Sequence, residues 1–337
     1  MKIQSYVNGQ WVSGDGRTQQ CLNAVNDEVV GEINSLTSGF DELLNYGRTK
    51  AGPALRKLTI HQRAQMIKAL ASYLLERKED FYRISYLTGA TKADSWVDIE
   101  GGIGTMFSYS GIARRELNND TFIVEGPVEP LSKNGTFVGR HILTSKEGVS
   151  VHINAFNFPI WGMLEKITPS LIAGVPVIVK PGSVTCYLTE AVVKAMVESK
   201  IFPEGSIQLI CGSVGDLLDH LNEQDVVTFT GSASTGQMLK AHKNIIAKSI
   251  PFTMEADSLN CCILAPDVKV EDPEFDLYIK EIAREMTTKA GQKCTAIRRI
   301  FAPKNMTEAV GDALKARLLK TTIGDPTKEG VRMGALV

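Results

Sequence analysis

Short apolar runs alternate with longer amphipathic runs through the middle of the chain, and this alternation constrains the fold more than any other feature. The strand-like runs occupy residues 149–153, 175–179, 206–210 and 226–229. Helical patterns lie between and after them, at residues 163–173, 188–198, 216–221 and 235–241. Parallel strands need a crossover long enough to hold a helix, so the pattern predicts an α/β fold with a doubly wound parallel sheet.

The carboxyl ends of these strands carry chemically notable residues. Sheets of this kind bind ligands just outside the carboxyl ends of their strands. The residues at those positions are Asn157, Lys180, Gly212, Gly215, Thr230 and Gly231. Their concentration at one edge of the predicted sheet indicates a nucleotide site.

Two of these segments have both a functional and an ordinary interpretation. Residues 230–236 form a glycine-bounded loop before a helix, where backbone N–H groups attract phosphate, yet small loops of this kind are often tight turns. The loop also lacks the G-x-G-x-x-G fingerprint of dinucleotide sites. Lys180 ends an apolar strand before Pro181, and is either a surface lysine at a turn or a cation that holds a ribose or phosphate.

Cys294 is the candidate nucleophile. A helical pattern over residues 275–288 runs into Gly291 and a strand-like run follows, so the thiol lies on a turn that glycine loosens. A lone cysteine is more often buried and inert. We expect Lys289 and Lys293 to favour the thiolate here, because positive charge lowers a thiol pKa. The cysteines in apolar runs, which we interpret as inert core residues, are Cys211, Cys261 and Cys262.

A carboxylate and an amide complete the candidate site. Glu255 follows a strand-like approach at residues 251–254, so we expect it to be partly buried, and burial raises a carboxyl pKa toward that of a general base. Asn157 lies in the segment 154–159, just after a predicted strand. A thiol, a carboxylate and an amide on loops of an α/β chain are the parts of covalent acyl chemistry.

The bulk composition excludes several classes of partner. With 337 residues, 43% of them apolar, the chain is long enough for two lobes with large cores. Its formal net charge of −1 gives no basic footprint for nucleic acid or an anionic membrane. No run approaches the roughly 18 apolar residues that a membrane helix needs, and the N-terminus lacks a secretory h-region. We therefore expect a cytoplasmic protein.

The cysteines and histidines indicate neither disulfides nor a metal site. The six cysteines contain no Cys-x-x-Cys pair, so we expect reduced thiols, most of them small core residues. The five histidines form no His-x-x-x-His or Glu-flanked pattern, so we predict no metal.

Three further segments have recognisable local structure. Residues 5–12 predict a hairpin, because Asn8-Gly9 suits a type I′ turn, which needs two positive φ angles. Thr59 and Gln62 fit a capping box at the start of a helix. Residues 126–145 are less regular and are either a projecting hairpin or a linker.

Taken together, these motifs resemble the aldehyde dehydrogenase superfamily along essentially the whole chain. Residues 154–159 resemble the segment that carries the oxyanion-hole asparagine, which maps to Asn157. Glu255 matches the general-base glutamate, and residues 291–294 match the segment of the nucleophile, Cys294. The resemblance implies oxidation of an aldehyde to a carboxylic acid through a cysteine thioester, which Glu255 helps water to hydrolyse.

The resemblance also implies a nicotinamide coenzyme. Lys180 resembles the lysine that contacts the adenosine ribose, and residues 229–232 resemble the loop under the pyrophosphate. NAD-preferring relatives often carry an acid three places after this lysine, where this chain has Ser183, so NADP is favoured over NAD. The coenzyme contacts that the resemblance implies are Ala155, Phe156, Lys180, Gly182, Ser183, Gly215, Phe229, Thr230, Gly231, Ser232 and Ala256.

Three segments are similar to one branch of the family, the phenylacetate-degradation dehydrogenases fused to an oxepin-CoA hydrolase. These segments are residues 94–104, 152–159 and 252–262. The likeness implies a CoA-linked aldehyde substrate, 3-oxo-5,6-dehydrosuberyl-CoA semialdehyde, and a hydratase domain in the full-length protein. The family also implies a homo-oligomer.

The resemblance divides the chain into three parts. Residues 1–125 and 146–257 correspond to a Rossmann-like NADP-binding domain, residues 126–145 to an oligomerisation hairpin, and residues 258–337 to the first part of an α/β catalytic domain. The chain ends before the family's later glutamate-phenylalanine motif, so we expect a partial chain that exposes apolar surface and aggregates.

One departure concerns the residues after the glutamate. The usual Glu-Leu-Gly-Gly segment reads Glu255-Ala256-Asp257-Ser258 here, so two flexible glycines are missing. Two alternative functions stay open. One is a CoA-acylating dehydrogenase, which does not need the base that Glu255 supplies; the other is an inactive nucleotide-binding or structural module.

Overall fold

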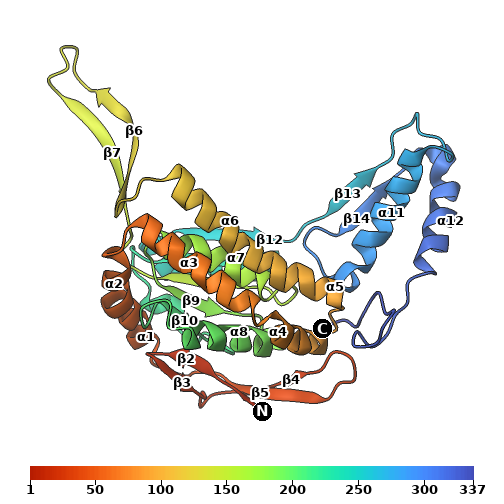
Figure 1. The fold of residues 1–337 in the computed structure, drawn as a ribbon, viewed down its shortest axis with the longest axis horizontal. Coiled ribbons are helices and arrows are strands. Elements are labelled where there is room, and N and C mark those ends of the chain that lie inside the picture. The colour runs from red at the N-terminus through yellow and green to blue at the C-terminus, as the bar shows by residue number, and fades with distance from the viewer.

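The computed structural model describes all of residues 1–337, and it contains a helix-covered sheet, a projecting hairpin and a smaller lobe (Figure 1). The strands are β1 (Lys2–Ile3), β2 (Ser5–Val7), β3 (Gln10–Val12), β4 (Thr18–Leu22), β5 (Val29–Asn34), β6 (Phe122–Pro130), β7 (Val138–Thr144), β8 (Ser150–Ile153), β9 (Val177–Lys180), β10 (Ile207–Leu209), β11 (Val226–Gly231), β12 (Phe252–Ala256), β13 (Asn260–Ile263) and β14 (Ile297–Phe301).

Twelve α-helices and seven short helical turns of other types connect these strands. The α-helices are α1 (Phe40–Tyr46), α2 (Gly52–Arg56), α3 (Ile60–Leu75), α4 (Lys78–Ser85), α5 (Lys92–Ser95), α6 (Gly101–Glu116), α7 (Trp161–Ile172), α8 (Cys186–Glu198), α9 (Ala233–Lys240), α10 (Lys243–Ala247), α11 (Pro273–Thr287) and α12 (Thr307–Leu318). The short turns are η1 (Gly47–Ala51), η2 (Tyr86–Thr88), η3 (Trp96–Glu100), η4 (Ser183–Thr185), η5 (Leu217–His220), η6 (Thr288–Gly291) and η7 (Lys304–Met306).

The main sheet confirms the predicted doubly wound topology. Its seven strands have the order β12-β11-β8-β9-β10-β2-β3, and the five from β12 to β10 run parallel. The N-terminal hairpin β2-β3 extends the sheet antiparallel to β10. Its turn has the predicted positive φ angles, 53° at Asn8 and 78° at Gly9.

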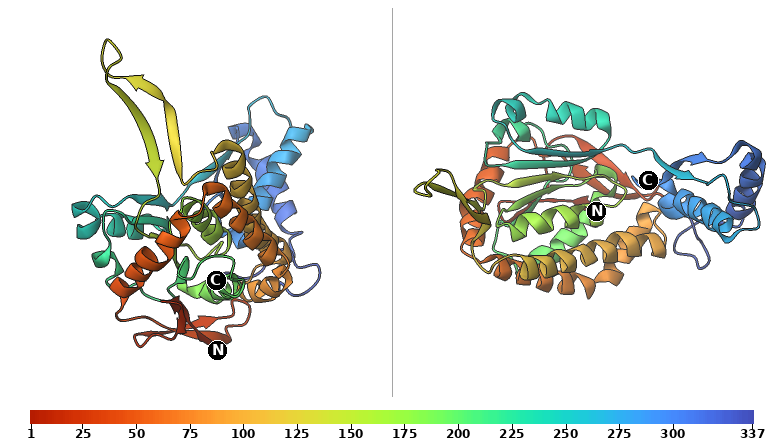
Figure 2. Two further views of the ribbon diagram at one scale, coloured as in Figure 1. Left: turned by 60° about the vertical axis from the view of Figure 1, so that its left-hand side comes forward. Right: turned by 90° about the horizontal axis from the view of Figure 1, so that it is seen from above.

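Both faces of the sheet are covered by helices, as the views of Figure 2 show. On one face, Val177 and Val179 of β9 join a core cluster of 35 buried residues with α3, α6, α7 and α8. On the other face, Ile178 joins a cluster of 15 residues with α1 and α10. Burial on both faces explains why the parallel strands are apolar throughout rather than alternating.

Two parts of the chain lie outside these cores. Strands β6 and β7 pair antiparallel in a long hairpin that projects from the body, which decides between the hairpin and the linker left open for residues 126–145 (Figure 1). Strands β13 and β14 form a parallel pair packed against α11 and α12, with a small core of its own around Tyr278 and Ile282. We refer to β13, β14, α11 and α12 as the small lobe.

Two local predictions were wrong. The helix expected over residues 216–221 is only the short turn η5, where the chain makes a single tight turn before β11. Cys261 is exposed rather than in a core, because α11 covers one face of the β13-β14 pair and the side chains of the other face remain open.

The capping box of Thr59 and Gln62 is confirmed at the start of α3. None of the helices combines the length and the apolar character needed to cross a membrane.

Candidate active site

The loop that carries Cys294 is a left-handed turn between α11 and β14. After α11 ends, Lys289, Ala290 and Gly291 have φ angles of 54°, 52° and 75°. Among these three residues, the sequence predicts a positive φ angle only at Gly291. For residues with a side chain, the left-handed conformation costs roughly 1–2 kcal/mol each, so Lys289 and Ala290 need contacts that hold them there.

Those contacts come from distant parts of the chain. The carboxylate of Asp94 accepts a hydrogen bond of 2.8 Å from the backbone N–H of Lys289. The carbonyl of Gly291 accepts one of 2.6 Å from Arg298 Nη2. The buried Lys289 ammonium lies 3.4 Å from Thr88 Oγ1. The nucleophile loop is therefore anchored to α5 and η2 of the main body.

The expectation that Lys289 and Lys293 favour the Cys294 thiolate was wrong. Lys293 Nζ donates to both carboxylate oxygens of Glu285 on α11, at 2.8 and 2.7 Å. Lys289 points into the body of the protein, beside Asp94. Partial burial and the neighbouring carboxylate of Glu255 instead raise the pKa of the Cys294 thiol.

Asn157 reaches the nucleophile loop directly. It follows β8 and is half-buried, and its Nδ2 donates a hydrogen bond of 3.0 Å to the carbonyl of Gln292, two residues before Cys294. A side-chain amide has two N–H donors, so one N–H of Asn157 is not used by this bond. The backbone of Cys294 is held from the other side, where its carbonyl accepts from Asn260 Nδ2 at 2.7 Å and from Ser258 Oγ.

Glu255 lies at the end of β12, where it pairs in register with Thr230 of β11. Its side chain is exposed, so the expectation of partial burial was wrong: the edge strand β12 has a neighbour on one side only. Thr230 Oγ1 donates to its carboxylate at 3.4 Å. Lys166 Nζ in turn contacts Thr230 Oγ1 and donates to Asn154 Oδ1 at 3.1 Å.

The expected coenzyme residues gather at the carboxyl edge of the sheet. Lys180 ends β9 and is largely buried; its Nζ donates to the Pro181 carbonyl at 2.9 Å, and burial lowers its pKa. Gly182 lies so close to Phe156 that a Cβ there would be 3.0 Å from it, which brings the loops after β8 and β9 together. The other members are Ala155 after β8, Ser183 at the start of η4, Gly215 after β10, residues 229–232 at the end of β11, and Ala256 at the end of β12.

The loop after β11 caps a helix, as expected for an anion site. Ser232 Oγ accepts from the Thr235 N–H at 3.3 Å at the start of α9. The carboxylate of Asp257, however, accepts from the Ala233 N–H at 3.1 Å and already provides a negative group there. Asp257 has a φ of 39°, a conformation that favours the glycine of the resembled segment.

Two further side chains of the site region were not among the predicted site residues. Glu165 and Lys166 lie on α7; Glu165 Oε2 accepts from Trp161 Nε1 at 3.0 Å, and burial raises its pKa. Glu165 also contributes to the raised pKa of Cys294. Their signal in the sequence is an adjacent acid and base inside an otherwise apolar helix.

Comparison with known proteins identifies the family. A family model described as the aldehyde dehydrogenase family matches residues 11–337. The chain belongs to the aldehyde dehydrogenase family. The predicted fold class is confirmed, because solved structures that include an aldehyde dehydrogenase from Brucella melitensis biovar abortus 2308 share the fold, here with a TM-score of 0.86 at 22% identity. That match covers 100% of this chain and 67% of the other.

Two further relatives are informative. The chain is 44% identical to a 3,4-dehydroadipyl-CoA semialdehyde dehydrogenase from Aromatoleum evansii over 338 residues, which cover 100% of this chain and 65% of that protein. This aldehyde dehydrogenase chain thus spans about two thirds of that relative. A betaine aldehyde dehydrogenase from Staphylococcus aureus in complex with NAD+ is similar in fold, with a TM-score of 0.80, 24% identity, and coverage of 100% of this chain and 64% of that one.

Proposed function

We propose that this protein oxidises the aldehyde group of a CoA-linked semialdehyde to a carboxylic acid, with NADP as the electron acceptor. The observation that carries the proposal is the convergence on one loop. Asn157 bonds to the carbonyl two residues before Cys294, and the Glu255 carboxylate is close enough to raise the pKa of the Cys294 thiol. An amide donor, a thiol and a carboxylate from three separate segments thus meet at the nucleophile loop.

The chemistry of each side chain follows from its surroundings. Cys294, as the thiolate, attacks the carbonyl carbon and forms a thiohemiacetal. The remaining Nδ2–H of Asn157 and the backbone N–H of Cys294 donate to the developing oxyanion. Lys180 and residues 229–232 would hold a nicotinamide coenzyme, which would supply the hydride acceptor needed to oxidise the thiohemiacetal to a thioester. Glu255 takes a proton from the water that hydrolyses this thioester, and its exposed position gives water access to the carboxylate.

The coenzyme assignment is supported by the carboxyl edge of the sheet. The close approach of Gly182 to Phe156 brings two loops together at the strand ends, where sheets of this kind bind a nucleotide. Lys180 ends β9, and Ser183, three places later at the start of η4, is not an acid and would not repel a 2′-phosphate, which favours NADP over NAD. Asp257, which accepts from the first N–H of α9, is an acidic group at this helix start.

The substrate class comes from the relative that acts on 3,4-dehydroadipyl-CoA semialdehyde. We propose a semialdehyde of that class, including 3-oxo-5,6-dehydrosuberyl-CoA semialdehyde of phenylacetate degradation, for the whole protein. Further parts of the proposal are a homo-oligomer, a fused hydratase domain, a cytoplasmic location and the division into a coenzyme domain (1–125 and 146–257), a hairpin (126–145) and a catalytic domain (258–337).

The test follows NADPH formation from a CoA-linked semialdehyde by stopped flow. Cys294→Ala should abolish both the burst and the turnover, and Asn157→Ala should lower kcat by about 100- to 1,000-fold, the usual effect of losing one oxyanion donor. Glu255→Gln should slow turnover more than the burst, because it removes the base for hydrolysis alone. Cys261→Ala, which removes another exposed thiol, is the matched control and should leave all rates unchanged.

Two outcomes would contradict the proposal. If Glu255→Gln lowers the burst and the turnover equally, Glu255 is not the base for thioester hydrolysis. A CoA thioester as the product, rather than a free acid, would instead identify a CoA-acylating dehydrogenase. Mass spectrometry of the products decides whether water or CoA accepts the acyl group from Cys294.

A further inference from the structure

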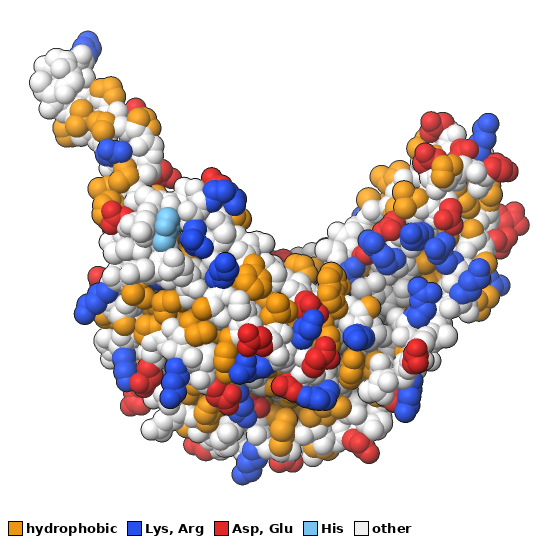
Figure 3. Space-filling view, viewed as in Figure 1, with side chains coloured by type: hydrophobic (Ala, Val, Ile, Leu, Met, Phe, Trp, Pro, Cys, Tyr) orange, Lys and Arg blue, Asp and Glu red, His pale blue; other side chains and the backbone are white.

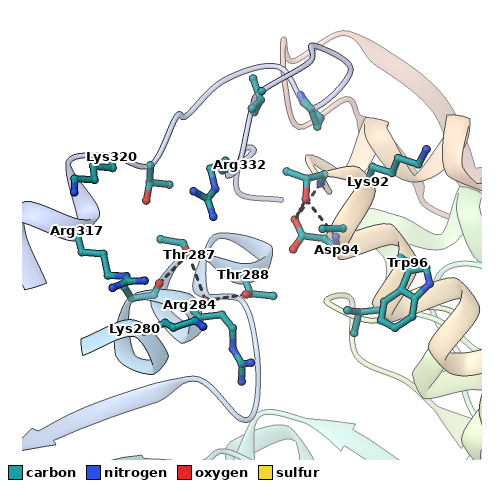
Figure 4. A pocket seen from close by; sticks show the side chains of 18 of the residues that line it. Lys92, Asp94, Trp96, Lys280, Arg284, Thr287, Thr288, Arg317, Lys320 and Arg332 are labelled. Atoms are coloured by element: carbon teal, nitrogen blue, oxygen red, sulfur yellow. Dashed lines mark hydrogen bonds between the residues drawn. The ribbon is translucent and has the colours of Figure 1, made fainter. Parts of the chain in front are cut away.

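A large cleft separates the small lobe from the main body (Figure 4). It has a volume of about 1290 Å³, above the roughly 300–1,000 Å³ of common small-molecule sites. One wall is formed by α5 and η3, where Lys92, Asp94 and Trp96 lie; α11, α12 and residues 320–332 form the other. None of the expected coenzyme residues lines it. We call it the basic cleft.

The charge of the basic cleft is strongly one-sided. Its cationic lining residues are Lys92, Lys280, Arg284, Arg317, Lys320, Lys328 and Arg332. The acidic ones are Asp94, Asp276 and Glu329. Lysines and arginines gather over the small lobe in the space-filling view (Figure 3). Seven cations facing three acids create a positive potential, which the walls of a cleft focus.

Most of this positive charge has no acidic partner in the protein. Arg284 pairs with the carboxylates of α11 next to it, and Arg317 pairs with Asp276 at 3.1 Å. Asp94 already accepts from Thr91 and from the Lys289 N–H, so it offers little to the cleft. The cations that form no salt bridge are Lys92, Lys280, Lys320, Lys328 and Arg332. Of these, Lys92 lies near Glu100 and Lys328 near Asp325. The other three, Lys280, Lys320 and Arg332, have no such carboxylate and favour a ligand with several negative charges.

An aromatic ring completes the basic cleft. Trp96 lies at the start of η3, on the wall opposite the small lobe, and its side chain is 57% exposed (Figure 4). An indole is a large flat surface on which a nucleobase stacks. Cations on one wall and an exposed indole on the other are the features that bind a phosphorylated nucleoside.

We propose that the basic cleft binds the phosphorylated adenosine of the CoA-linked substrate, with the phosphates on Lys280, Lys320 and Arg332 and the adenine against Trp96. This inference rests on the proposed function and names the place of the CoA group. Arginine and lysine are the usual ligands of phosphate in proteins. The phosphorylated adenosine of NADP has similar chemistry, but the coenzyme residues lie at the strand ends of the main sheet.

The basic cleft is also joined to the nucleophile. Thr287 and Thr288 line it, and the chain from Thr288 runs through η6 to Cys294. Asp94, a residue of the cleft wall, holds the Lys289 N–H of the same loop. One wall of the basic cleft and the nucleophile loop therefore belong to one continuous, mutually bonded part of the structure.

The experiment measures CoA binding to the 337-residue chain by isothermal titration calorimetry. The test variant combines Lys280→Gln, Lys320→Gln and Arg332→Gln. The control variant removes three lysines elsewhere, Lys57→Gln, Lys68→Gln and Lys133→Gln, all exposed and without a salt bridge. We expect the test variant to bind CoA at least tenfold more weakly and with a smaller salt dependence, while the control binds as the unaltered chain does.

Further ligands and one further variant identify the groups that bind. Dephospho-CoA, which lacks the 3′-phosphate, should bind at least fivefold more weakly than CoA, and Trp96→Phe should reduce the quenching of tryptophan fluorescence by CoA. NADP affinity should be the same in all variants. Competition between NADP and CoA for one site would overturn the inference, since both would then occupy the coenzyme edge. Equal displacement of CoA by inorganic pyrophosphate at matched concentration would show a general anion site instead, and would also overturn it.

The inference and the proposed function fail separately. If the test variant keeps its CoA affinity while turnover still depends on Cys294, the basic cleft is not the CoA site and the proposed function stands. If CoA binds in a manner that depends on Lys280, Lys320 and Arg332 but no semialdehyde is oxidised, the basic cleft stands and the proposed function is wrong. In an active enzyme, the test variant should raise KM for the CoA-linked substrate at least tenfold with little change in KM for a simple aldehyde.

Discussion

At the scale of single residues, the candidate base acts on the pKa of the candidate nucleophile. Cys294 has no lysine beside it, because Lys289 and Lys293 are bonded elsewhere. Partial burial and the Glu255 carboxylate both disfavour the thiolate and raise the pKa of the thiol. A bound positive group, such as the nicotinamide ring, would act in the opposite direction and favour the thiolate.

Replacing Glu255 tests this coupling. Glu255→Gln removes a negative charge beside the thiol, so the pKa of Cys294 should fall toward its ordinary value. The pH dependence of alkylation of Cys294 by iodoacetamide, followed by mass spectrometry, measures the change: the midpoint should move to lower pH. Glu76→Gln, an exposed acid on another surface, serves as the control. An unmoved midpoint in the Glu255 variant would show that burial alone sets the pKa.

At the scale of elements, a buried histidine joins two strands and a helix under the site. His152 of β8 contacts Thr228 Oγ1 of β11 at 2.8 Å and Ser170 Oγ of α7 at 3.2 Å. Burial, together with the charge of Lys166, lowers the pKa of His152 to about 3. The imidazole therefore stays neutral in the folded protein at pH values where the unfolded chain binds a proton.

The consequence is a loss of stability in acid. Because the unfolded state binds the proton and the folded state does not, the contribution of His152 to the unfolding free energy decreases as pH falls below about 6.5. Between pH 6.5 and 5 the loss is about 2 kcal/mol, at 1.36 kcal/mol per pKa unit. Urea unfolding of His152→Gln should show a flatter pH dependence than the unaltered chain, by about that amount. His141→Gln, on the exposed hairpin, should leave the pH dependence unchanged.

The comparison between variants is needed because another buried group, Asp98, changes stability with pH in the opposite direction to His152. Burial raises the pKa of Asp98 to about 6, against the effect of Lys289 and the N–H groups of Ile160 and Trp161. Its contribution to stability is present in acid and is lost as pH rises through about 6. The two trends partly cancel in the unaltered chain, and only the difference between variants isolates His152. An identical slope in His152→Gln would mean that the histidine is protonated in the folded state.

At the scale of the whole molecule, the projecting hairpin β6-β7 exposes more apolar surface than an isolated hairpin tolerates. Its exposed apolar side chains are Val128, Leu131, Phe137, Val138, Ile142 and Leu143. A two-stranded hairpin is marginally stable in water by itself, and contiguous exposed apolar side chains mark interaction surfaces. The hairpin is therefore the part of the structure best suited to contact another copy of the chain.

We expect self-association through this hairpin. Phe137→Asp combined with Ile142→Asp should weaken association at least tenfold, equivalent to about 1.4 kcal/mol, because charges would be buried in the contact. Size-exclusion chromatography with light scattering measures the change in mass across a concentration series. Thr136→Asp, next to Phe137 but polar in the native chain, should keep the native mass. A monomer in the unaltered chain, or the same mass in all variants, would contradict the expectation.

The sequence by itself determined the layered framework and the position of the candidate site. The apolar runs from Val149 to Phe229 and the helical patterns between them encode strands and helices locally, and the crossover rule then leaves a doubly wound parallel sheet. The positions of strand ends follow from the same pattern, so the sequence predicts Asn157, Lys180 and Thr230 at one edge of the sheet. Local periodicity is sufficient for this, because each element is specified by neighbouring residues.

Only the tertiary structure decided the electrostatic state of the site. Lys289 was expected near the thiol, but Asp94, 195 positions away in the chain, holds it in a left-handed turn that points it into the body. Glu255 was expected to be partly buried, yet its strand lies at the edge of the sheet. The cations of the basic cleft come from α5, α11, α12 and the last loop, and no stretch of sequence shows them together. Burial and charge depend on groups distant along the chain, and only the packing of the elements brings those groups into contact.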